Sequence, residues 1–496
     1  MIYDVVIIGA GVVGGAVARE LSRYNLSIVA LEKEADVCCG ISKANTGIIH
    51  SPALIKKETK KAEYTIRGNL MFNKMSRELG FQVQWPGALI LAYSEEDKTV
   101  LEKYKSHGEY TREKFSAGEV LYRYVNKDEL LKKEPSLSRK VIGALHVPDA
   151  GRVIPYEFGI ALWENAVSNG VQLKLNQTVV SLEKDNRNHD EELWVLKTAM
   201  NEYRAKYVVN AAGHGSNELG LQAGFPDSHI QKVKGQYLIY DRNRNLDIQH
   251  ILFQVPLKGN RKAGKGILVC KTVYGNLMIG PDARLIEDEN DRGTDRETLL
   301  DVLRGAERSV EDLDAKKVIK TFSGIRPKPA GGDFIIESHN HFYHLCGIES
   351  PGLTSSPAIG EDILKMMVRD GLDLSEKSNF NPFRKAIISS VLDIKGQDLK
   401  TRVEYPDSHP DQIICRCEVV PRSRITDALS RGIPVLTIDG VKRRTRAGQG
   451  RCQGAFCGKR VRRLLSQENH VPEESITQRG SESPHSGIAG KDLFKG

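Results

Sequence analysis

Residues 4–32 of the chain read DVVIIGAGVVGGAVARELSRYNLSIVALE. The stretch has the order strand, glycine-rich turn, helix and second strand, and its GxGxxG pattern is formed by Gly9, Gly11 and Gly14. In such a βαβ unit the first glycine allows the tight turn, the second lets the backbone approach a pyrophosphate, and the third lets the helix pack closely on the strand. Glu32 ends the second strand, where a carboxylate can accept hydrogen bonds from ribose hydroxyls. The stretch therefore predicts a Rossmann-like α/β domain that binds a dinucleotide.

Three further segments favour FAD over NAD as this dinucleotide. They are a small-residue loop at 42–49 (SKANTGII), a strand that runs into a small-residue turn at 207–213 (YVVNAAG), and residues 346–354 (CGIESPGLT). A helix is expected after the third segment, from about Ala358 to Val368, and its start can direct backbone N–H groups at an anion or a flavin carbonyl. The residues expected to bind the cofactor are Gly9, Gly11, Gly14, Glu32, Lys33, Ser42, Asn45, Thr46, Val179, Ala211, Gly213, Gly352, Leu353 and Thr354.

Four cysteines near the end of the sequence form a second motif, CxC followed by CxxxxC. They are Cys415, Cys417, Cys452 and Cys457. Four thiolates from two tight loops suit a [2Fe–2S] cluster or a zinc ion. Zinc ribbons usually present CxxC pairs, and a flavin upstream gives a redox-active cluster a use that zinc would lack, so the spacing favours iron and sulfur. Cys38 and Cys39, near the expected flavin site, are interpreted as small core residues, and a redox role for them stays open.

Together with Ser323-Gly324-Ile325-Arg326-Pro327, the nucleotide segments resemble the flavoprotein oxidoreductases related to D-amino-acid oxidase and glycerol-3-phosphate dehydrogenase. The four-cysteine segment resembles the bacterioferritin-associated-ferredoxin type of [2Fe–2S] domain. The resemblance covers residues 1–465, and it implies FAD bound across a split nucleotide domain, with the substrate beneath a separate β-sheet.

The expected fold class is α/β plus α+β: a split Rossmann-like FAD domain, a mixed β-sheet substrate domain and a small C-terminal iron–sulfur domain. The expected boundaries are 1–80, 148–225 and 323–375 for the FAD domain, 81–147 and 226–322 for the substrate domain, 376–407 for a connector, and 408–466 for the [2Fe–2S] domain. Residues 467–496 are rich in Ser, Glu, Gly and His without periodicity, and we expect them to be disordered.

Three residues are candidates for substrate binding and catalysis. Arg326 lies between a glycine-containing turn and a proline, and a planar guanidinium can grip a carboxylate or phosphate with two hydrogen bonds. The resemblance implies that this arginine anchors the anionic group of the substrate; the alternative is a surface or structural arginine. His50 ends the loop after the second strand and could take the proton of an alcohol, although packing or a hydrogen bond to the flavin is an equal alternative. Lys234 could hold a second anionic group or be a solvated lysine.

The sequence is thus interpreted as an FAD-dependent dehydrogenase that oxidises a small anionic alcohol and sends electrons from FADH₂ through the cluster to a partner subunit or a quinone. Family resemblance favours glycerol 3-phosphate, oxidised to dihydroxyacetone phosphate, as the substrate. The alternatives are an L-2-hydroxy acid such as 2-hydroxyglutarate and an amino or imino acid. A non-enzymatic alternative is an electron-transfer subunit of a flavoprotein complex.

Charge and hydropathy suggest where the protein acts. The chain has 496 residues and a net charge of +8, and its apolar runs are only long enough for strands. We expect a cytoplasmic protein, either free or held at the inner face of the membrane through a partner, in an oligomer or hetero-complex. Residues 408–466 hold 13 Lys or Arg against four Asp or Glu. Nucleic acid is one partner for such a patch, but cations that stabilise an anionic cluster fit better, so no nucleic-acid binding is expected.

Overall fold

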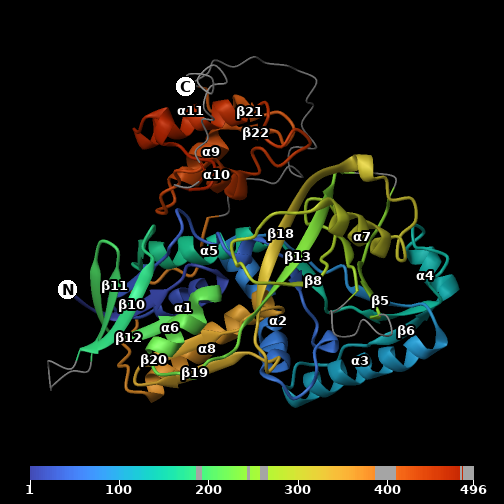
Figure 1. Ribbon diagram of the computed structural model, residues 1–496, viewed down its shortest axis with the longest axis horizontal. Coiled ribbons are helices and arrows are strands. Elements are labelled where there is room, and N and C mark those ends of the chain that lie inside the picture. Colours follow the sequence, from blue (N-terminus) through green and yellow to red (C-terminus); the bar gives the residue numbers. More distant parts are fainter. Residues whose placement is uncertain (186–192, 243–245, 257–265, 386–408, 481–482, 484–496) are drawn as a thin grey trace.

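The computed structural model describes residues 1–185, 193–242, 246–256, 266–385, 409–480 and 483 (Figure 1). Two large sheets with their helices form the body of the molecule, and a small C-terminal module lies above the region where the two halves meet (Figure 1). The expected fold class is confirmed: the chain combines a mostly parallel α/β sheet, a mixed sheet and a separate small module.

The first sheet has eight strands and contains the glycine-rich turn. Its parallel centre has the order β20, β12, β1, β2 and β9, and antiparallel strands extend it on the β12 side. The strands are β1 (Ile2–Ile8), β2 (Ile28–Leu31), β9 (Gln172–Lys174), β10 (Val179–Asp185), β11 (Leu193–Thr198), β12 (Glu202–Asn210), β19 (Ile335–His339) and β20 (Phe342–Cys346). All of them lie within the three ranges expected for the FAD domain.

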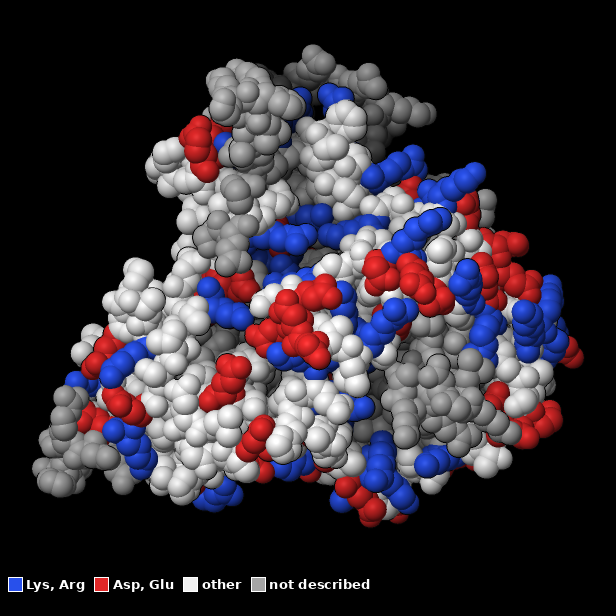
Figure 2. Space-filling view, viewed as in Figure 1, with Lys and Arg blue, Asp and Glu red and all other residues white. Residues whose placement is uncertain are grey.

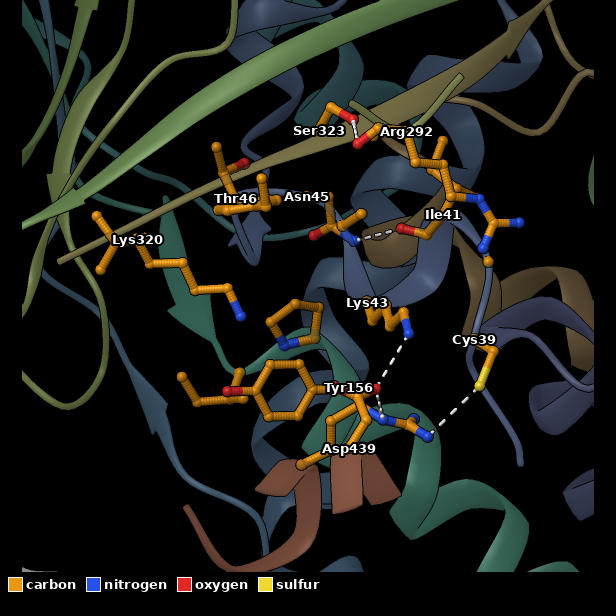
Figure 3. Close-up of a pocket in the computed structure, with 18 of the residues that line it drawn as sticks. Cys39, Ile41, Lys43, Asn45, Thr46, Tyr156, Arg292, Lys320, Ser323 and Asp439 are labelled. Carbon is orange, nitrogen blue, oxygen red and sulfur yellow. Dashed lines mark hydrogen bonds and ion pairs between the residues drawn. The ribbon is translucent and has the colours of Figure 1, made fainter. Parts of the chain in front are cut away.

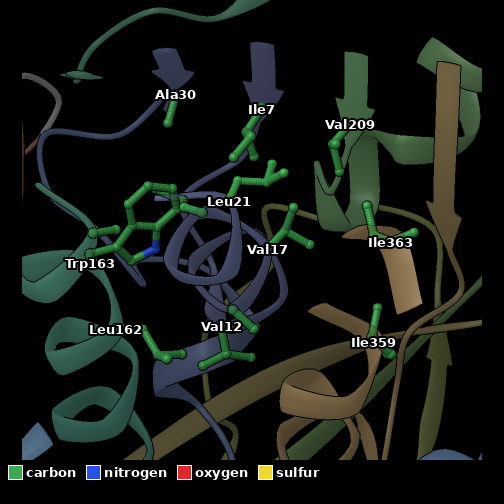
Figure 4. Packing of buried hydrophobic residues seen from close by; sticks show 14 of the residues in the cluster. Ile7, Val12, Val17, Leu21, Ala30, Leu162, Trp163, Val209, Ile359 and Ile363 are labelled. Atoms are coloured by element: carbon green, nitrogen blue, oxygen red, sulfur yellow. The ribbon is translucent and has the colours of Figure 1, made fainter. Parts of the chain in front are cut away.

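Helix α1 (Val12–Leu21) packs between this sheet and two further helices, α5 (Pro155–Ser168) and α8 (Gly352–Arg369). Figure 4 shows the apolar side chains that fill the space, with Trp163 on one side of α1 and Ile363 on the other. The approach is close because a Cβ atom at Gly14 would lie 2.1 Å from the carbonyl oxygen of Gly9, so only glycine fits there. The helix expected from Ala358 begins six residues earlier, at Gly352.

The second sheet has nine strands and is mixed, since β5 and β14 run parallel while their other neighbours are antiparallel. The strands are β5 (Ala88–Ala92), β6 (Arg123–Asn126), β7 (Gly143–Val147), β13 (Gln231–Tyr240), β14 (Ile251–Gln254), β15 (Val269–Lys271), β16 (Leu277–Ile279), β17 (Arg284–Ile286) and β18 (Val318–Lys328). The long pair β13 and β18 runs along the boundary between the two halves (Figure 1). Strand β18 crosses the expected boundary at 322/323.

The remaining elements complete the two halves and the module. A three-stranded sheet joins β3 (Ile48–Ile49), β8 (Gly151–Val153) and β4 (Val83–Gln84). The other helices of the body are α2 (Lys60–Leu79), α3 (Glu95–Lys114), α4 (Lys127–Lys133), α6 (Ser216–Gln222) and α7 (Arg296–Ala306). The module contains β21 (Ile413–Cys415), β22 (Val420–Pro421), α9 (Arg422–Leu429), α10 (Ile438–Thr445) and α11 (Gly458–Asn469).

The expected disordered tail is wrong for residues 467–480. Helix α11 continues to Asn469, and Thr477 forms a β-bridge with Thr437 of the module. Ile476 is buried in the apolar core of the module, which explains why this polar-rich segment is held. Residues 484–496, and most of the expected connector, lie outside the described part of the chain.

The module is attached to the body by buried ion pairs. Arg443 and Arg444 of α10 both donate hydrogen bonds to the carboxylate of Asp36, at distances of 2.6 to 2.8 Å. All three side chains are at most 4% exposed. Burial alone would raise the pKa of Asp36, but the two guanidinium groups hold it below its usual value.

These contacts correct the expectation that the basic run from Lys442 to Arg446 surrounds the cysteines. Arg443 and Arg444 face the body, and Arg446 pairs with Glu418 at 2.8 Å while its guanidinium lies 3.8 Å from the ring centre of Tyr274. The physical reason is that buried arginines need carboxylate partners, which Asp36 and Glu418 supply.

Replacing Asp36 by alanine is expected to lower the free energy of unfolding by about 3–5 kcal/mol, because it removes the nearest carboxylate of two buried guanidinium groups. Chemical denaturation of the holoprotein measures the loss. The control is Asp301→Ala, since the Asp301 side chain is 52% exposed and its pairs with Arg284 and Arg304 lie on the surface; there the expected loss is under about 1 kcal/mol. Equal losses in the two variants would contradict the structural role of Asp36.

Within the described residues, no helix is long and apolar enough to cross a membrane.

Candidate active site

A cavity of about 620 Å³ runs from the glycine-rich turn to the underside of the second sheet. Most of the residues predicted to bind cofactor or substrate line it: Gly9, Gly11, Glu32, Lys33, Ser42, Asn45, Thr46, His50, Val179, Ala211, Gly213, Arg326, Gly352 and Leu353. Gly14, Lys234 and Thr354 do not line it. One elongated cavity is thus lined by residues at the ends of the parallel strands and by His50 and Arg326, the two candidates for substrate chemistry.

The nucleotide end of the cavity is built around Glu32. Its carboxylate accepts hydrogen bonds from the backbone N–H of Ala10 at 2.6 Å and of Glu34 at 2.9 Å. Burial raises the pKa of Glu32 to about 6, because the charged carboxylate is removed from water. The backbone hydrogen bonds oppose this rise, since they favour the charged form.

The turn itself fits a pyrophosphate. Gly9 has a φ of +98°, and a Cβ atom there would lie 2.5 Å from the carbonyl oxygen of Ala211, so no other residue can take its place. Ser42 accepts a hydrogen bond from the backbone N–H of Val12 at 3.0 Å and thereby holds its loop against the start of α1. These observations fit a bound dinucleotide with its phosphates at the helix N-terminus.

The loop at 41–46 is held by its own polar groups. The Asn45 side chain donates to the carbonyl oxygens of Ile41 and Ser42 at 3.1 and 3.0 Å and accepts from the backbone N–H of Gly47 at 2.8 Å. Asn45 therefore shapes the wall of the cavity, and its side chain is already used within the loop.

Thr354 also has a structural role, although it does not line the cavity. Its hydroxyl accepts a hydrogen bond from the backbone N–H of His50 at 2.9 Å and donates to the carbonyl oxygen of Ile48 at 3.2 Å. The threonine fixes the strand that carries His50.

His50 reaches the cavity from the end of strand β3. The side chain is buried, and its Nε2 lies 3.5 Å from the hydroxyl of Ser350. Its ring lies 6.1 Å from that of Phe253 on the second sheet, and Asn69 donates a hydrogen bond to its backbone carbonyl at 3.1 Å. A histidine held in this way can exchange a proton with a group in the cavity.

Arg326, on strand β18, presents a guanidinium to the same cavity. Its Nη2 donates to the backbone carbonyl of Asp282 at 3.2 Å, while its Nε is buried and has no hydrogen-bond partner within the described residues. A buried N–H of a permanently charged group costs free energy when it is left unsatisfied. The arrangement fits an anionic ligand.

Lys234, suggested as a ligand of a second anionic group or as a solvated lysine, does not line this cavity. Its ammonium group pairs with Asp291 at 2.8 Å. In the β13–β18 pair, Arg326 lies opposite Val233 and Lys234 lies opposite Ile325. Because successive side chains of a strand point to opposite faces, Lys234 lies on the face opposite Arg326.

Several residues of the cavity were not identified from the sequence. Tyr237 and Phe253 of the second sheet and Ser350 of the loop before α8 all line it. Tyr237 stacks on Phe322 with ring centres 4.5 Å apart. The sequence alone contained no signal for Tyr237, because its face follows from the register that places Arg326 opposite Val233 of the same strand.

The four cysteines of the module meet as two pairs. The Sγ atoms of Cys417 and Cys452 are 3.5 Å apart, and Cys415 contacts Cys457. That contact lowers the pKa of the Cys415 thiol to about 6. Over the described ranges, no three potential ligands form a group around a single metal ion. Two thiol pairs fit a two-iron cluster, which takes two cysteine ligands on each iron.

The glycines around the second cysteine pair add to this fit. A Cβ atom at Gly450 would lie 2.6 Å from the Cβ atom of Cys417, so the backbone is packed directly against the thiol-bearing loop. The backbone N–H of Gly448 points at the sulfur of Cys415 at 3.5 Å, the kind of contact that stabilises a thiolate.

Cys38 and Cys39 are buried thiols. Burial raises the pKa of both, to about 11 in Cys39, although the nearby Arg443 opposes the shift. Thiols that stay protonated at neutral pH are poor nucleophiles, which supports their interpretation as small core residues.

Comparison with known proteins agrees with this geometry. The family model described as FAD dependent oxidoreductase matches residues 4–366, and the model described as BFD-like [2Fe-2S] binding domain matches residues 413–467. A glycerol 3-phosphate dehydrogenase from Caloramator mitchellensis is 37% identical over 477 residues, which cover 96% of this chain and 96% of that protein.

Two oxidases resemble about three quarters of the chain. A glycerol 3-phosphate oxidase from Mycoplasma genitalium is 30% identical over 76% of this chain and 97% of the oxidase. The FAD-bound structure of dithionite-reduced L-α-glycerophosphate oxidase from Mycoplasma pneumoniae superimposes with a TM-score of 0.71 and 28% identity, covering 77% of this chain and 98% of the oxidase. The chain therefore belongs to the FAD-dependent oxidoreductases, and with its C-terminal BFD-like domain its cofactors are FAD and a [2Fe–2S] cluster.

Proposed function

We propose that the chain oxidises glycerol 3-phosphate to dihydroxyacetone phosphate and delivers the electrons through its [2Fe–2S] cluster to an acceptor. The observation that carries the proposal is the buried Nε of Arg326, which has no partner within the described residues and lines the same cavity as His50. The dehydrogenase from Caloramator mitchellensis, which matches the chain over nearly its whole length, supports this choice of substrate.

In this proposal Arg326 binds the phosphate and sets the position of the alcohol. A guanidinium can form two parallel hydrogen bonds to phosphate oxygens, which fixes orientation as well as affinity. Nε2 of His50 takes the proton of the hydroxyl group, and Ser350, 3.5 Å from that nitrogen, helps to orient the ring. Tyr237 and Phe253 keep water from the reacting carbon. Lys234 has no part in the proposal, because it is paired with Asp291.

The cofactor sites follow from the same residues. Gly9, Gly11, Glu32 and Ser42 would hold the nucleotide part of FAD, and the loop at 41–46 and the start of α8 would hold its ring system. Cys415, Cys417, Cys452 and Cys457 would hold the cluster. When bound, FAD takes two electrons from the substrate and the cluster transfers them singly.

The share of the chain that each relative matches favours an electron acceptor other than oxygen. The Mycoplasma genitalium oxidase matches 76% of this chain, whereas the Caloramator mitchellensis dehydrogenase matches 96% of it. We propose that the acceptor docks on the exposed face of the module, where Cys417, Arg416, Phe456 and Lys459 are open to solvent. Cations around an apolar side chain suit an acidic partner protein.

Anaerobic mixing of the purified holoprotein with glycerol 3-phosphate tests the proposed substrate. We expect the flavin absorbance band to bleach with glycerol 3-phosphate and to persist with L-2-hydroxyglutarate and L-proline at the same concentration. Bleaching by L-2-hydroxyglutarate alone would mean that the substrate is a hydroxy acid and not glycerol 3-phosphate. If none of the three bleaches the band, this subunit is not the dehydrogenase that we propose.

A further inference from the structure

A second cavity, of about 480 Å³, lies where the two halves of the body meet the C-terminal module. Its walls come from the loop at 39–46, from strand β18 and from residues 439–453 of the module. The loop lines both cavities, as do Glu34, His214, Glu289 and Arg292, whereas His50 and Arg326 line only the first. Figure 2 shows Lys and Arg side chains gathered in the hollow beneath the module.

The lining of this cavity is strongly cationic. It contains three acidic side chains and eight basic ones, namely Lys43, Arg152, Arg292, Lys320, Lys442, Arg443, Arg446 and Arg479. Some of the basic groups have carboxylate partners, such as Arg446 with Glu418. Within the described residues, no carboxylate lies within ion-pair distance of four of them: Arg152, Lys320, Lys442 and Arg479. When all charged side chains of the lining are counted, whether paired or not, the basic groups outnumber the acidic ones.

The excess is concentrated around one carboxylate. Asp439 pairs with Lys43 at 3.1 Å and with Arg443 at 3.2 Å, and these cations together hold its pKa far below the usual value despite its burial. Lys320 and Lys442 line the same cavity close to this carboxylate, and the Lys442 ammonium donates to Oε1 of Gln453 at 3.4 Å. Figure 3 shows Lys320 reaching from its strand into the cavity, on the side of Tyr156. Neighbouring ammonium groups repel each other, and an anion bound to both would remove that cost.

The rest of the lining combines apolar and aromatic side chains with uncharged polar ones such as Asn276, Thr321 and Gln449. Tyr156 and Phe322 line the cavity, together with Met278 and Pro155. The Tyr156 hydroxyl is tied to Gln449 of the module at 3.0 Å, which leaves the face of its ring as a wall. The volume lies in the range of sites for small organic ligands, which combine apolar walls with a few placed charges.

We propose that this junction cavity binds a small organic phosphate, with the phosphate dianion between Lys320 and Lys442 and the organic part against Tyr156 and Phe322. A phosphate matches the site because its oxygens accept hydrogen bonds from several ammonium and guanidinium groups at once. The ligand would contact the flavin loop, the second sheet and the module together, so its binding stabilises the docked module by mass action.

Calorimetric titration of the FAD-loaded holoprotein with adenosine monophosphate tests the site, and sulfate serves as an anion without an organic part. FAD already fills the nucleotide end of the first cavity in this preparation. We expect saturable binding of adenosine monophosphate, weaker binding of sulfate, and affinities reduced about ten-fold or more in Lys320→Gln and in Lys442→Gln. Lys317→Gln, an exposed lysine just before the same strand, is the matched control and should bind like the wild type.

Proton uptake on ligand binding is a second measurement, and it would not occur if Lys442 had only a structural role. Burial, together with Lys320, lowers the pKa of Lys442 to about 7; Arg479 lowers it further and Asp439 opposes the shift. At pH 8 the free Lys442 is therefore mostly neutral, and a bound dianion should make it take up a proton. Titrations at pH 8 in two buffers of different ionisation enthalpy should show uptake of up to about one proton in the wild type and less in Lys442→Gln.

The outcomes separate this site from the proposed substrate site. Arg326→Ala should leave the binding of adenosine monophosphate unchanged, because Arg326 does not line the junction cavity. Absence of binding, or equal binding in wild type, Lys320→Gln and Lys442→Gln, would overturn the proposal. Binding lost only in Arg326→Ala would also overturn it and would assign the ligand to the substrate cavity.

Discussion

Replacing Arg326 by alanine is expected to lower kcat/KM for glycerol 3-phosphate by about 10²-fold or more, mostly through a higher KM. Arg326 lines the cavity that also contains His50, and its buried Nε has no partner within the described residues. Removing it takes away the proposed charge-assisted pair with the phosphate, which is stronger than a hydrogen bond between neutral groups. Steady-state kinetics with an artificial electron acceptor measures the change.

Two further variants test whether the loss of activity comes from the guanidinium group of Arg326. Arg326→Lys keeps the charge but loses the planar pair of donors, so we expect an intermediate loss. Arg304→Ala removes an arginine that is 72% exposed on helix α7, and its kinetics should match the wild type. Unchanged kinetics in Arg326→Ala would remove this residue from the substrate site.

The substitution Cys452→Ser is expected to abolish the visible and EPR signals of the [2Fe–2S] cluster while glycerol 3-phosphate still reduces the flavin. Its Sγ lies 3.5 Å from that of Cys417, and a serine hydroxyl does not supply the thiolate that iron requires. The first cavity contains no residue of the module, so flavin reduction does not depend on the cluster ligands. Turnover with the natural acceptor should fall to the background rate.

A cysteine outside the motif is the control for this result. Cys346 is buried at the end of strand β20, and Cys346→Ala should keep the full cluster signal. If Cys452→Ser also loses reduction of the flavin by the substrate, the linear order of electron transfer from flavin to cluster is wrong.

The nucleotide site was predictable because its determinants are close in sequence. Gly9 and Gly14 are set by the sterics of one turn, and Glu32 follows at the end of the next strand. The cysteine motif was predictable for a related reason, since CxC and CxxxxC each place two thiols on one tight loop. Local geometry of this kind follows from short stretches of sequence.

The predictions that the structure contradicts depend on contacts between residues far apart in the sequence. Lys234 was suggested as a ligand of a second anionic group, but the register of β13 against β18 places it opposite Ile325, and it pairs with Asp291. The basic run at 442–446 seemed to belong to the cluster, but two of its arginines pair with Asp36, about 400 residues earlier in the chain. Neither strand register nor the partner of a buried charge can be derived from neighbouring residues.

The sequence by itself determined the fold class and the two cofactors, because glycine sterics and cysteine spacing act over a few residues. Only the tertiary structure decided that His50 and Arg326 share one cavity, that Lys234 does not, and that the module closes a second, cationic cavity against the flavin loop. These features depend on segments far apart in the chain, whose meeting is determined by the packing of whole sheets and by the need of buried charges for partners.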